Sequence, residues 1–375
     1  MNIDYDIHGL LSLRLVDPAP SLARVTARQL NPLRPTTLTS EPDVSISHLA
    51  AARSRKKRFR LGDAGDGQES EFSGSGFTLR KGGTAVSIPF DSVGASCAIA
   101  CSRGAGMRRL LVDYVRPALQ LSLLPKGAMA LHAAAVSHNG KGVLLAGWAE
   151  SGKTEAMLGF LQAGASFVSD KWTIVDGDGA SIHHFPTPIT VRHWMIDLIP
   201  GLRERLTGSE RLRAKAAGLA ASALRGDGAL SRVPAVGEVK GFADLVGRIS
   251  VTPGQLFGKT GDGRSQWRRS ASAPLHSLFL LITSSDDKVL VRPADADEVA
   301  RRLADCAVYE RRTFLGLYQR YRFAFPGRPN PVIEDAREVE RGMLSEALAS
   351  KRVFTVEAPF PFFPAALYEA IQDFC

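Results

Sequence analysis

The chain of 375 residues has few cysteines, and no two of them form a CxxC pair. Cys97 and Cys101 lie in the segment SCAIACS. On a strand, both thiols would face one side, too far apart for a natural disulfide or a tight metal clip. Cys375 is the last residue, so it is not a prenylation site, which needs its cysteine fourth from the end. We therefore expect buried free thiols.

Long apolar runs are also missing. No segment approaches the roughly 20 uninterrupted apolar residues that span a bilayer. The N-terminal segment MNIDYDIHGL has acidic residues and a histidine where a signal peptide would have lysines and an apolar run. We therefore expect a cytoplasmic protein with no membrane partner.

Acidic residues are fewer than basic ones, and the net charge is +9. Most of this excess lies in one short run, RSRKKRFR at residues 53–60, which contains no acid. A nucleic-acid-binding surface would instead show a basic face with interleaved aromatic residues. We therefore interpret the run as a solvated loop or strand edge and expect no nucleic-acid partner.

The length exceeds the usual size of a single hydrophobic core, which favours two domains. Short segments with strand-like alternation, separated by Pro, Gly and Asp clusters, fill the first hundred residues. They predict a β-rich N-terminal module, residues 1–125, for substrate recognition or assembly. A helix follows in RRLLVDYVRPALQLSLL, where Pro117 should kink or split it. The strand candidates are HGLLSLRLV, DVSISHL, GFTLRKG, TAVSIPF and SCAIACS.

The pattern changes near residue 126, and we assign residues 126–375 to a second, α/β domain. The apolar segments LHAAAVSH and KGVLLAG are joined by Asn139-Gly140, a strong signal for a two-residue β-hairpin. The segment TEAMLGFLQ predicts a helix that Gly164 ends. SFVSDKWTIV predicts one strand, followed by a turn at residues 176–179 and a returning strand in ASIHHF.

Later segments are mostly helical in pattern. The basic, Ala-rich segment at residues 201–226 predicts one or two helices, with Leu212, Ala216, Leu219 and Ala223 on one apolar face. PLHSLFLLIT predicts a buried strand, and DADEVARRLADCAVY a capped helix. GQLFGKT has one residue too few between its glycines for a phosphate loop, so we interpret it as an ordinary loop.

The segment GWAESGKT fits the phosphate-loop pattern G-x-x-x-x-G-K-T. The two glycines let backbone N–H groups converge on phosphate oxygens, the lysine supplies a cation, and the threonine hydroxyl can bind Mg²⁺. An apolar strand precedes the loop and a helix follows it at once, so the helix dipole adds to the anion site. The nucleotide-binding residues predicted here are Gly147, Trp148, Ala149, Glu150, Ser151, Gly152, Lys153 and Thr154.

Asp170 follows shortly after this loop, within SFVSDKW. An acid in the middle of an apolar strand is costly unless it meets a cation or a hydrogen-bond donor. Most phosphate-loop proteins place the acidic partner of Mg²⁺ several elements later. The arrangement therefore predicts a carboxylate that faces the metal or the attacking hydroxyl.

The order of these features, from His132 to Val175, resembles the catalytic core of HPr kinase/phosphorylase and its relatives. Those proteins have a His-bearing strand, a hairpin, a phosphate loop that ends in Lys-Ser/Thr-Glu, a helix, and an Asp-bearing strand. The resemblance implies a mixed α/β (α+β) fold shared in outline with phosphoenolpyruvate carboxykinases, with a bent sheet around the phosphate-loop helix. The first 120 residues carry no such match.

Carried over residue by residue, the resemblance implies that His132 lies beside the γ-phosphate, with Asp170 and Lys153 as the other catalytic residues. It implies that Thr154, Asp170 and Glu155 face the metal. A core histidine and a helix-dipole acid are the alternative readings for His132 and Glu155. HPr kinases carry a second acid after the first, where this chain has Lys171, so the reverse phosphorylase activity is in doubt.

The sequence thus predicts a kinase that transfers the γ-phosphate of ATP, or GTP, to a hydroxyl with Mg²⁺ as cofactor. The acceptor stays open between a serine of a protein or peptide and a small molecule. The alternative is a nucleotide-binding regulatory protein without phosphotransfer. Arg192 and Arg248 are weak candidates for clamping the γ-phosphate. The resembled family forms closed rings, so a homo-oligomer is also open.

Overall fold

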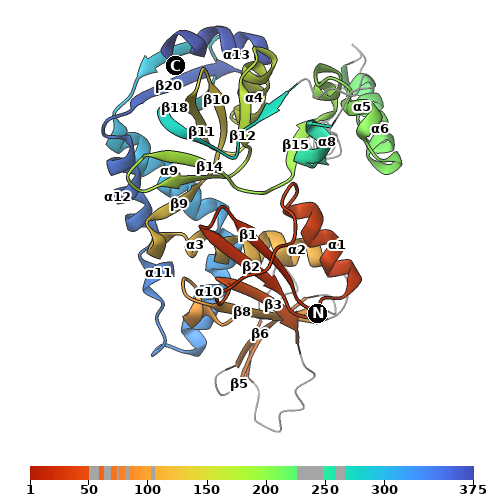
Figure 1. Cartoon of the computed structure of the whole chain (residues 1–375), viewed down its shortest axis with the longest axis vertical. Coiled ribbons are helices and arrows are strands. Elements are labelled where there is room, and N and C mark those ends of the chain that lie inside the picture. Colours follow the sequence, from red (N-terminus) through yellow and green to blue (C-terminus); the bar gives the residue numbers. More distant parts are fainter. Residues whose placement is uncertain are drawn as a thin grey trace.

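The computed structural model describes a mixed α/β chain with two large sheets (Figure 1). Most of the basic run at residues 53–60 and the residues that follow GQLFG fall outside the described part. No helix in the described part is long and apolar enough to cross a bilayer. The described residues are 1–49, 59–62, 69–73, 76–81, 84–102, 106–225, 248–258 and 267–375.

The first sheet has eight strands in the order β1-β2-β3-β8-β7-β6-β5-β4. All five predicted strands belong to it, while helix α1 (Pro20–Gln29), between β2 and β3, was not predicted. Cys97 and Cys101 are buried free thiols on β8, as expected. The strands are β1 (Ile3–Ile7), β2 (Leu11–Leu15), β3 (Val44–His48), β4 (Phe59–Gly62), β5 (Glu69–Ser73), β6 (Gly76–Lys81), β7 (Thr84–Ser87) and β8 (Cys97–Cys101).

The helix predicted around Pro117 is continuous but irregular. It begins as α2 (Met107–Arg109), widens into the π-helical η2 (Leu110–Val115) and ends as α3 (Arg116–Leu121). Proline has no backbone N–H to donate to the preceding turn. The predicted kink thus takes the form of a π segment just before the proline, a feature that is frequent at functional sites.

The second sheet has ten strands, and the thirteen-residue β18 runs through its centre. The Asn139-Gly140 hairpin between β10 and β11 is confirmed, with both residues at positive φ. The strands are β9 (Ala128–Leu131), β10 (Ala133–His138), β11 (Lys141–Gly147), β12 (Ser166–Ser169), β13 (Thr173–Asp176), β14 (Ser181–His184), β17 (Arg268–Arg269), β18 (Ser272–Ser284), β19 (Leu290–Pro293) and β20 (Arg352–Pro359).

The single strand predicted for SFVSDKWTIV is wrong. The chain leaves β12 at Asp170, turns at Lys171 with φ of 69°, and re-enters the sheet as β13. Strand β12 pairs with β10 and β17, whereas β13 pairs with β9 and β14. Asp170 is therefore in a sharp turn at the end of a strand and not in the middle of one.

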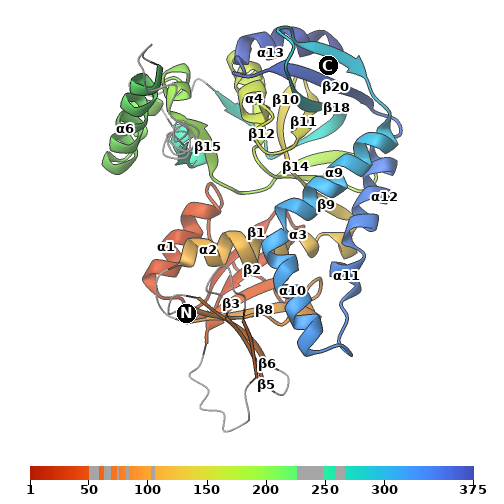
Figure 2. The same ribbon diagram turned by 180° about the vertical axis from the view of Figure 1, so that it is seen from behind.

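Helices cover both sheets (Figure 2). The predicted end of α4 at Gly164 is confirmed by its φ of 91°, and Asp295 caps α9 by accepting a hydrogen bond from the Glu298 N–H. The remaining elements are η1 (Phe90–Ser92), η3 (Leu124–Lys126), α4 (Lys153–Gln162), η4 (His193–Leu198), α5 (Leu202–Arg205), α6 (Gly208–Arg225), α8 (Pro253–Leu256), α9 (Ala296–Glu310), α10 (Arg312–Ala324), α11 (Pro331–Glu334), α12 (Ala336–Leu348), α13 (Pro364–Ile371) and η6 (Gln372–Phe374), with a small sheet of β15 (Ile189–Arg192) and β16 (Arg248–Val251).

The two large sheets divide near residue 125, but they share a hydrophobic core. Helices α9 to α12 of the C-terminal part extend along both halves of the molecule (Figure 2). Phe90 of the first half packs against Phe314 of α10, and the Asn330 side-chain amide donates hydrogen bonds to the carbonyls of Phe90 and Val93. A second core surrounds α4.

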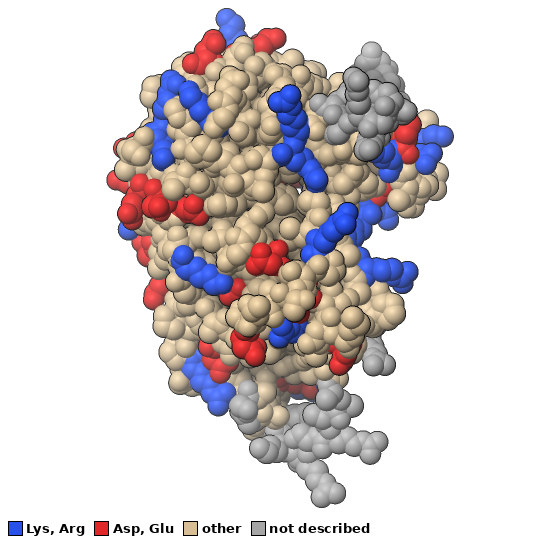
Figure 3. Space-filling view, viewed as in Figure 1, with Lys and Arg blue, Asp and Glu red and all other residues tan. Residues whose placement is uncertain are grey.

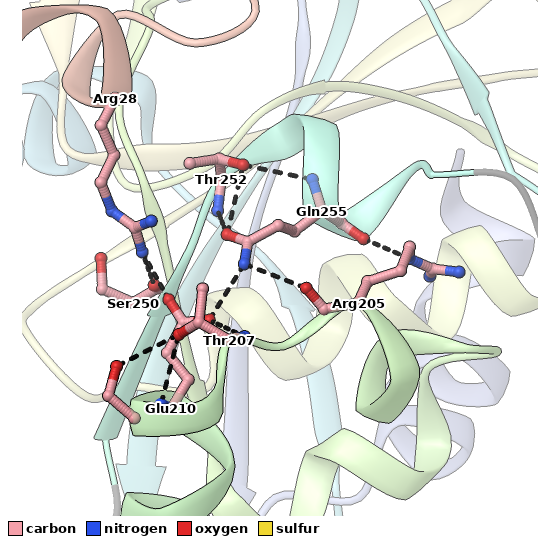
Figure 4. A network of polar contacts seen from close by, with 8 residues as sticks. Arg28, Arg205, Thr207, Glu210, Ser250, Thr252 and Gln255 are labelled. Carbon is pink, nitrogen blue, oxygen red and sulfur yellow. Dashed lines mark hydrogen bonds and ion pairs between the residues drawn. The ribbon is translucent and has the colours of Figure 1, made fainter. Parts of the chain in front are cut away.

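Helices α5, α6 and α8 form an arm with the β15–β16 pair, and a polar network ties this arm to α1 (Figure 4). The Arg28 guanidinium donates hydrogen bonds to Glu210 and to the Ser250 carbonyl, and the Gln255 amide also donates to Glu210. Several donors around one carboxylate make a strong junction. Burial acts to raise the pKa of Glu210, but the hydrogen bonds from the Thr207 N–H, Arg28 and Gln255 outweigh it and lower the pKa.

The helix predicted in the basic, Ala-rich segment is present as α6, but the predicted apolar face does not pack on the core. Leu212 and Leu219 are 69% and 73% exposed, whereas Ala217 is fully buried. Ala216 is exposed too, and the side chain of Ala223 lies outside the described residues. The contacts of Glu210 with α1 and α8 fix which side of the helix faces the molecule. The leucine side therefore faces outward.

Candidate functional site

Strand order brings the predicted site residues to one edge of the second sheet. Strand β10 is antiparallel to both β11 and β12, so it begins where those two strands end. His132 precedes β10, the loop after Gly147 follows β11, and Asp170 follows β12. Three segments that are separate in the sequence therefore meet at the N-terminus of α4.

Two positions in the loop accept only glycine. Gly147 and Gly152 have φ values of 148° and 90°. A Cβ atom on Gly147 would lie 2.5 Å from the Leu281 carbonyl oxygen, and one on Gly152 would lie 2.8 Å from the Phe362 ring. Both contacts are too close for a side chain, so the loop conformation depends on these glycines.

Lys153 is buried at the first position of α4. Its ammonium donates hydrogen bonds to the carbonyls of Gly147, at 2.9 Å, and Trp148. Burial lowers its pKa. The hydroxyl of Ser151, in the same loop, is buried and has no hydrogen-bond partner among the described residues. A cation and a hydroxyl donor are thus held where an anion would lie.

Thr154 and Asp170 are in direct contact. The Thr154 hydroxyl lies 3.1 Å and 3.3 Å from the two Asp170 carboxylate oxygens. Asp170 is 3% exposed, and burial raises its pKa. The Thr187 hydroxyl donates to the Asp170 backbone carbonyl and so fixes the turn. A hydroxyl and a carboxylate at this spacing form a pair of hard oxygen ligands.

Charged side chains from the β15–β16 pair face the loop. Glu150, at φ of 67°, contacts both Arg248 and Arg192. Arg192 also lies 3.8 Å from Glu155, whose pKa is raised by burial. The structure thus places both predicted arginines beside the loop. Glu155, a predicted metal ligand, has Arg192 as its ion-pair partner.

His132 lies in the wall of the same site, where it contacts α9. Its Nδ1 is 3.5 Å from the Cys306 thiol and 3.8 Å from a Glu310 carboxylate oxygen. Burial, followed by the positive charges of Lys153 and Lys171, lowers the pKa of His132 well below 6.5. Its imidazole is therefore neutral near pH 7, and burial raises the pKa of Cys306 to about 11.

These groups line a cavity of about 280 Å³ that we call the loop cavity. Three residues were not predicted from the sequence. Glu310 and Thr190 line the cavity, and the Cys306 thiol contacts His132. Glu310 is the last residue of an ordinary amphipathic helix, and no local pattern marks it. The residues that line the loop cavity are His132, Ala149, Glu150, Ser151, Gly152, Lys153, Thr154, Glu155, Asp170, Lys171, Thr190, Arg192, Arg248 and Glu310.

Comparisons of the chain with protein-family models and with curated proteins find no match. The chemistry of this site must therefore be argued from its own geometry. That geometry joins a loop with the phosphate-loop pattern, a buried lysine and a hydroxyl–carboxylate pair within one cavity. Such a set can bind a polyphosphate together with a hard divalent cation.

Proposed function

We propose that the loop cavity binds ATP, or GTP, with Mg²⁺ and that the protein transfers the γ-phosphate to a hydroxyl acceptor. The contact between the Thr154 hydroxyl and the Asp170 carboxylate carries this proposal. A phosphate loop alone needs only its glycines and lysine. A buried carboxylate in contact with the last loop residue adds the second half of a metal-assisted phosphoryl-transfer site.

The residues fit Mg²⁺ rather than a metal held by protein alone. Mg²⁺ is usually bound through one or two carboxylates together with substrate phosphates and waters. Among the described residues, no group of three or more His, Cys, Asp or Glu side chains is arranged so that it could hold a metal ion by itself. Thr154 and Asp170 would hold the ion, which supplies positive charge beside the transferring group. Glu155 stands in the same wall but pairs with Arg192.

The protein groups have distinct roles in the transfer. The loop amides and the Lys153 ammonium bind the β- and γ-phosphates, and Arg192 and Arg248 reach the γ-phosphate from β15 and β16. The acceptor oxygen forms the new bond to the γ-phosphorus as the bond to the β–γ bridging oxygen breaks. ADP leaves with that electron pair, and the hydroxyl proton passes to Asp170. Positioning and charge stabilisation supply most of the catalysis.

The arrangement of elements supports an HPr-kinase-like core. The ten-stranded sheet lies beside a buried helix that begins at the phosphate loop, and the Asp-bearing turn follows β12, the next strand in the chain (Figure 1). His132 belongs to the same edge, where its neutral ring packs on Trp172 with the ring centres 5.2 Å apart. We assign it a positioning role beside the γ-phosphate.

Lys171 favours a second candidate function, a nucleotide-binding regulator that does not transfer phosphate. It occupies the place after Asp170 where HPr kinases have a second acid, and it lines the loop cavity. A cation there binds phosphate but cannot take a proton from a hydroxyl while it is charged. Formation of a phosphorylated acceptor separates the two functions.

The test is ADP formation and acceptor phosphorylation by the purified chain with Mg-ATP. Asp170→Asn should lower the transfer rate by about 10²- to 10⁴-fold. Asp178→Asn is the matched control, because the exposed Asp178 accepts a hydrogen bond in a distant turn and asparagine can still accept it. Nucleotide binding without any phosphorylated product would favour the regulator, and absence of nucleotide binding would refute both.

A further inference from the structure

A second cavity, of about 570 Å³, lies where the first half of the molecule meets the β15–β16 pair. We call it the basic pocket. Among the described residues, its walls carry four cationic side chains, Arg108, Arg109, Arg116 and Lys171, and one carboxylate, that of Asp113. The other residues that line it are Gln29, Gly106, Val112, Thr187, Pro188, Thr190 and Ser250.

Most of these cations come from one face of the irregular helix 107–121. Arg108, Val112 and Arg116 are four residues apart, and the π-helical segment between the first and the last shifts the usual register. The space-filling view shows Lys and Arg side chains around the notch between the arm and the first half (Figure 3). The pocket therefore presents a concentrated positive charge.

Among the described residues, three of the four cations have no carboxylate within ion-pair distance, although Glu310 acts on Arg116 and Lys171 at longer range. Arg109 lies 3.7 Å from Asp113. Arg108, Arg116 and Lys171 form no ion pair within 4 Å among the described residues. The Nε of Arg116 is buried without a hydrogen-bond partner. Because like charges repel at close range and an unpaired buried donor is costly, a bound anion would stabilise this arrangement.

The basic pocket adjoins the loop cavity through shared walls. Lys171 and Thr190 line both, and Lys171 directly follows Asp170 in the tight turn after β12. A molecule in the basic pocket could therefore direct one end at Asp170 and the γ-phosphate while its other end lies among the arginines. Guanidinium groups suit the binding of such an end because their planar set of N–H donors matches the spacing of carboxylate and phosphate oxygens.

We propose that the basic pocket binds the phosphoacceptor, and that the acceptor is a small hydroxylated anion with a carboxylate or a phosphate group. This inference rests on the proposed phosphotransferase function. The cavity volume lies within the roughly 300–1,000 Å³ of small-molecule sites. The pocket also gives the first half of the molecule a role, because Gln29 and the arginines of helix 107–121 belong to it.

The probes are D-glycerate, glycerol 3-phosphate and uncharged glycerol, titrated by calorimetry with the loop cavity saturated by Mg²⁺ and a non-hydrolysable ATP analogue. The two anions distinguish carboxylate from phosphate, and glycerol tests whether charge is needed. The variant R108Q/R109Q removes two exposed arginines and so should fold. Arg24→Gln, an exposed arginine of α1 outside the pocket lining, is the matched control.

At least one anion should bind more tightly than glycerol, and R108Q/R109Q should weaken it about 10- to 100-fold, the effect of losing charged hydrogen bonds. The affinity for the ATP analogue should stay the same. In turnover, KM for that anion should rise by the same factor with kcat unchanged, and Arg24→Gln should alter neither.

The inference is overturned if glycerol binds as tightly as both anions, if R108Q/R109Q leaves their affinity unchanged, or if a serine peptide is phosphorylated while neither anion binds. Failure of the proposed function has a different signature. In that case the ATP analogue does not bind, or no phosphorylated product forms, while anion binding to the basic pocket is still lost in R108Q/R109Q.

Discussion

The loop cavity and the basic pocket lie side by side but treat their cations in opposite ways. In the loop cavity, Lys153 donates to loop carbonyls, and Arg192 and Arg248 contact Glu150. In the basic pocket, Arg108 and Arg116 have no such partners among the described residues. The first site holds its charges in internal contacts that a ligand must replace. The second has most of its cations without an ion-pair partner among the described residues.

The two cavities also differ in how deeply the elements that form them are buried. Helix α4, which carries the phosphate loop, is buried along nearly its whole length. The basic pocket is lined by exposed and half-buried residues of a helix with a π segment. Changes in α4 should therefore disturb the loop cavity through the core, whereas changes in the basic pocket should act locally.

Among the changes that distinguish the two cavities, the largest effect is expected from Lys153→Met. The substitution removes the cation that neutralises charge on the transferring phosphate, so kcat should fall by about 10²- to 10³-fold. Anion binding in the basic pocket should persist, because Lys153 does not line it. Loss of both binding activities together would show that the two cavities are a single site. Acceptor phosphorylation and calorimetry measure the two properties separately.

Gly159→Ala tests how tightly α4, the helix beside the loop cavity, is packed, through its effect on the free energy of unfolding. A Cβ atom at Gly159 would lie 2.2 Å from the Pro364 carbonyl oxygen, so α4 and α13 must move apart. We expect a loss of about 1–3 kcal/mol in the free energy of unfolding. The control is Gly316→Ala in α10, where a Cβ meets nothing within 4 Å; it should gain about 0.5–1 kcal/mol. Urea unfolding measures both, and equal effects would contradict the packing argument.

Glu150→Gln tests directly whether Glu150 neutralises the two arginines of the loop cavity. The carboxylate of Glu150 contacts Arg192 and Arg248 and is half exposed, so its loss frees both arginines at a modest cost. The affinity for Mg-ATP should increase by about 3- to 10-fold, the effect of removing two partly exposed ion pairs. Calorimetry measures the change. Weaker binding would mean that Glu150 itself contacts the nucleotide.

Arg28→Ala should have the smallest effect, and only on the basic pocket. Arg28 joins α1 to Glu210 and Ser250, and its neighbours Gln29 and Ser250 line the pocket. We expect the affinity for the bound anion to fall by about 2- to 5-fold, because the junction is partly exposed. The affinity for Mg-ATP should not change. An equal loss of both affinities would show that the arm moves as a whole.

Local patterns identified most of the residues that line the loop cavity, because these residues are close in the sequence. The hairpin, the phosphate loop, the helix end and Asp170 all fall between His132 and Asp170. Antiparallel pairing of β10 with β11 and β12 then brings the start of β10 beside the ends of the other two strands. The break at Lys171 was missed, since its positive φ is rare outside glycine and nothing in the apolar pattern marks it.

The basic pocket was not predictable in the same way. Its residues come from α1, helix 107–121, the turn after β12 and the β15–β16 pair, which only the tertiary fold brings together. The outward leucines of α6 have a similar cause. Helix periodicity identifies an apolar stripe, but the polar contacts of Glu210 decide which side packs.

The most direct test of the central claim is whether Asp170 links ATP binding to Mg²⁺. The wild-type chain and Asp170→Asn should each be titrated with ATP in Mg²⁺ and in EDTA. If Thr154 and Asp170 together hold the ion, Mg²⁺ should strengthen ATP binding to the wild type by about tenfold or more, and Asp170→Asn should lose most of that gain. The same dependence on Mg²⁺ in both proteins would contradict the account.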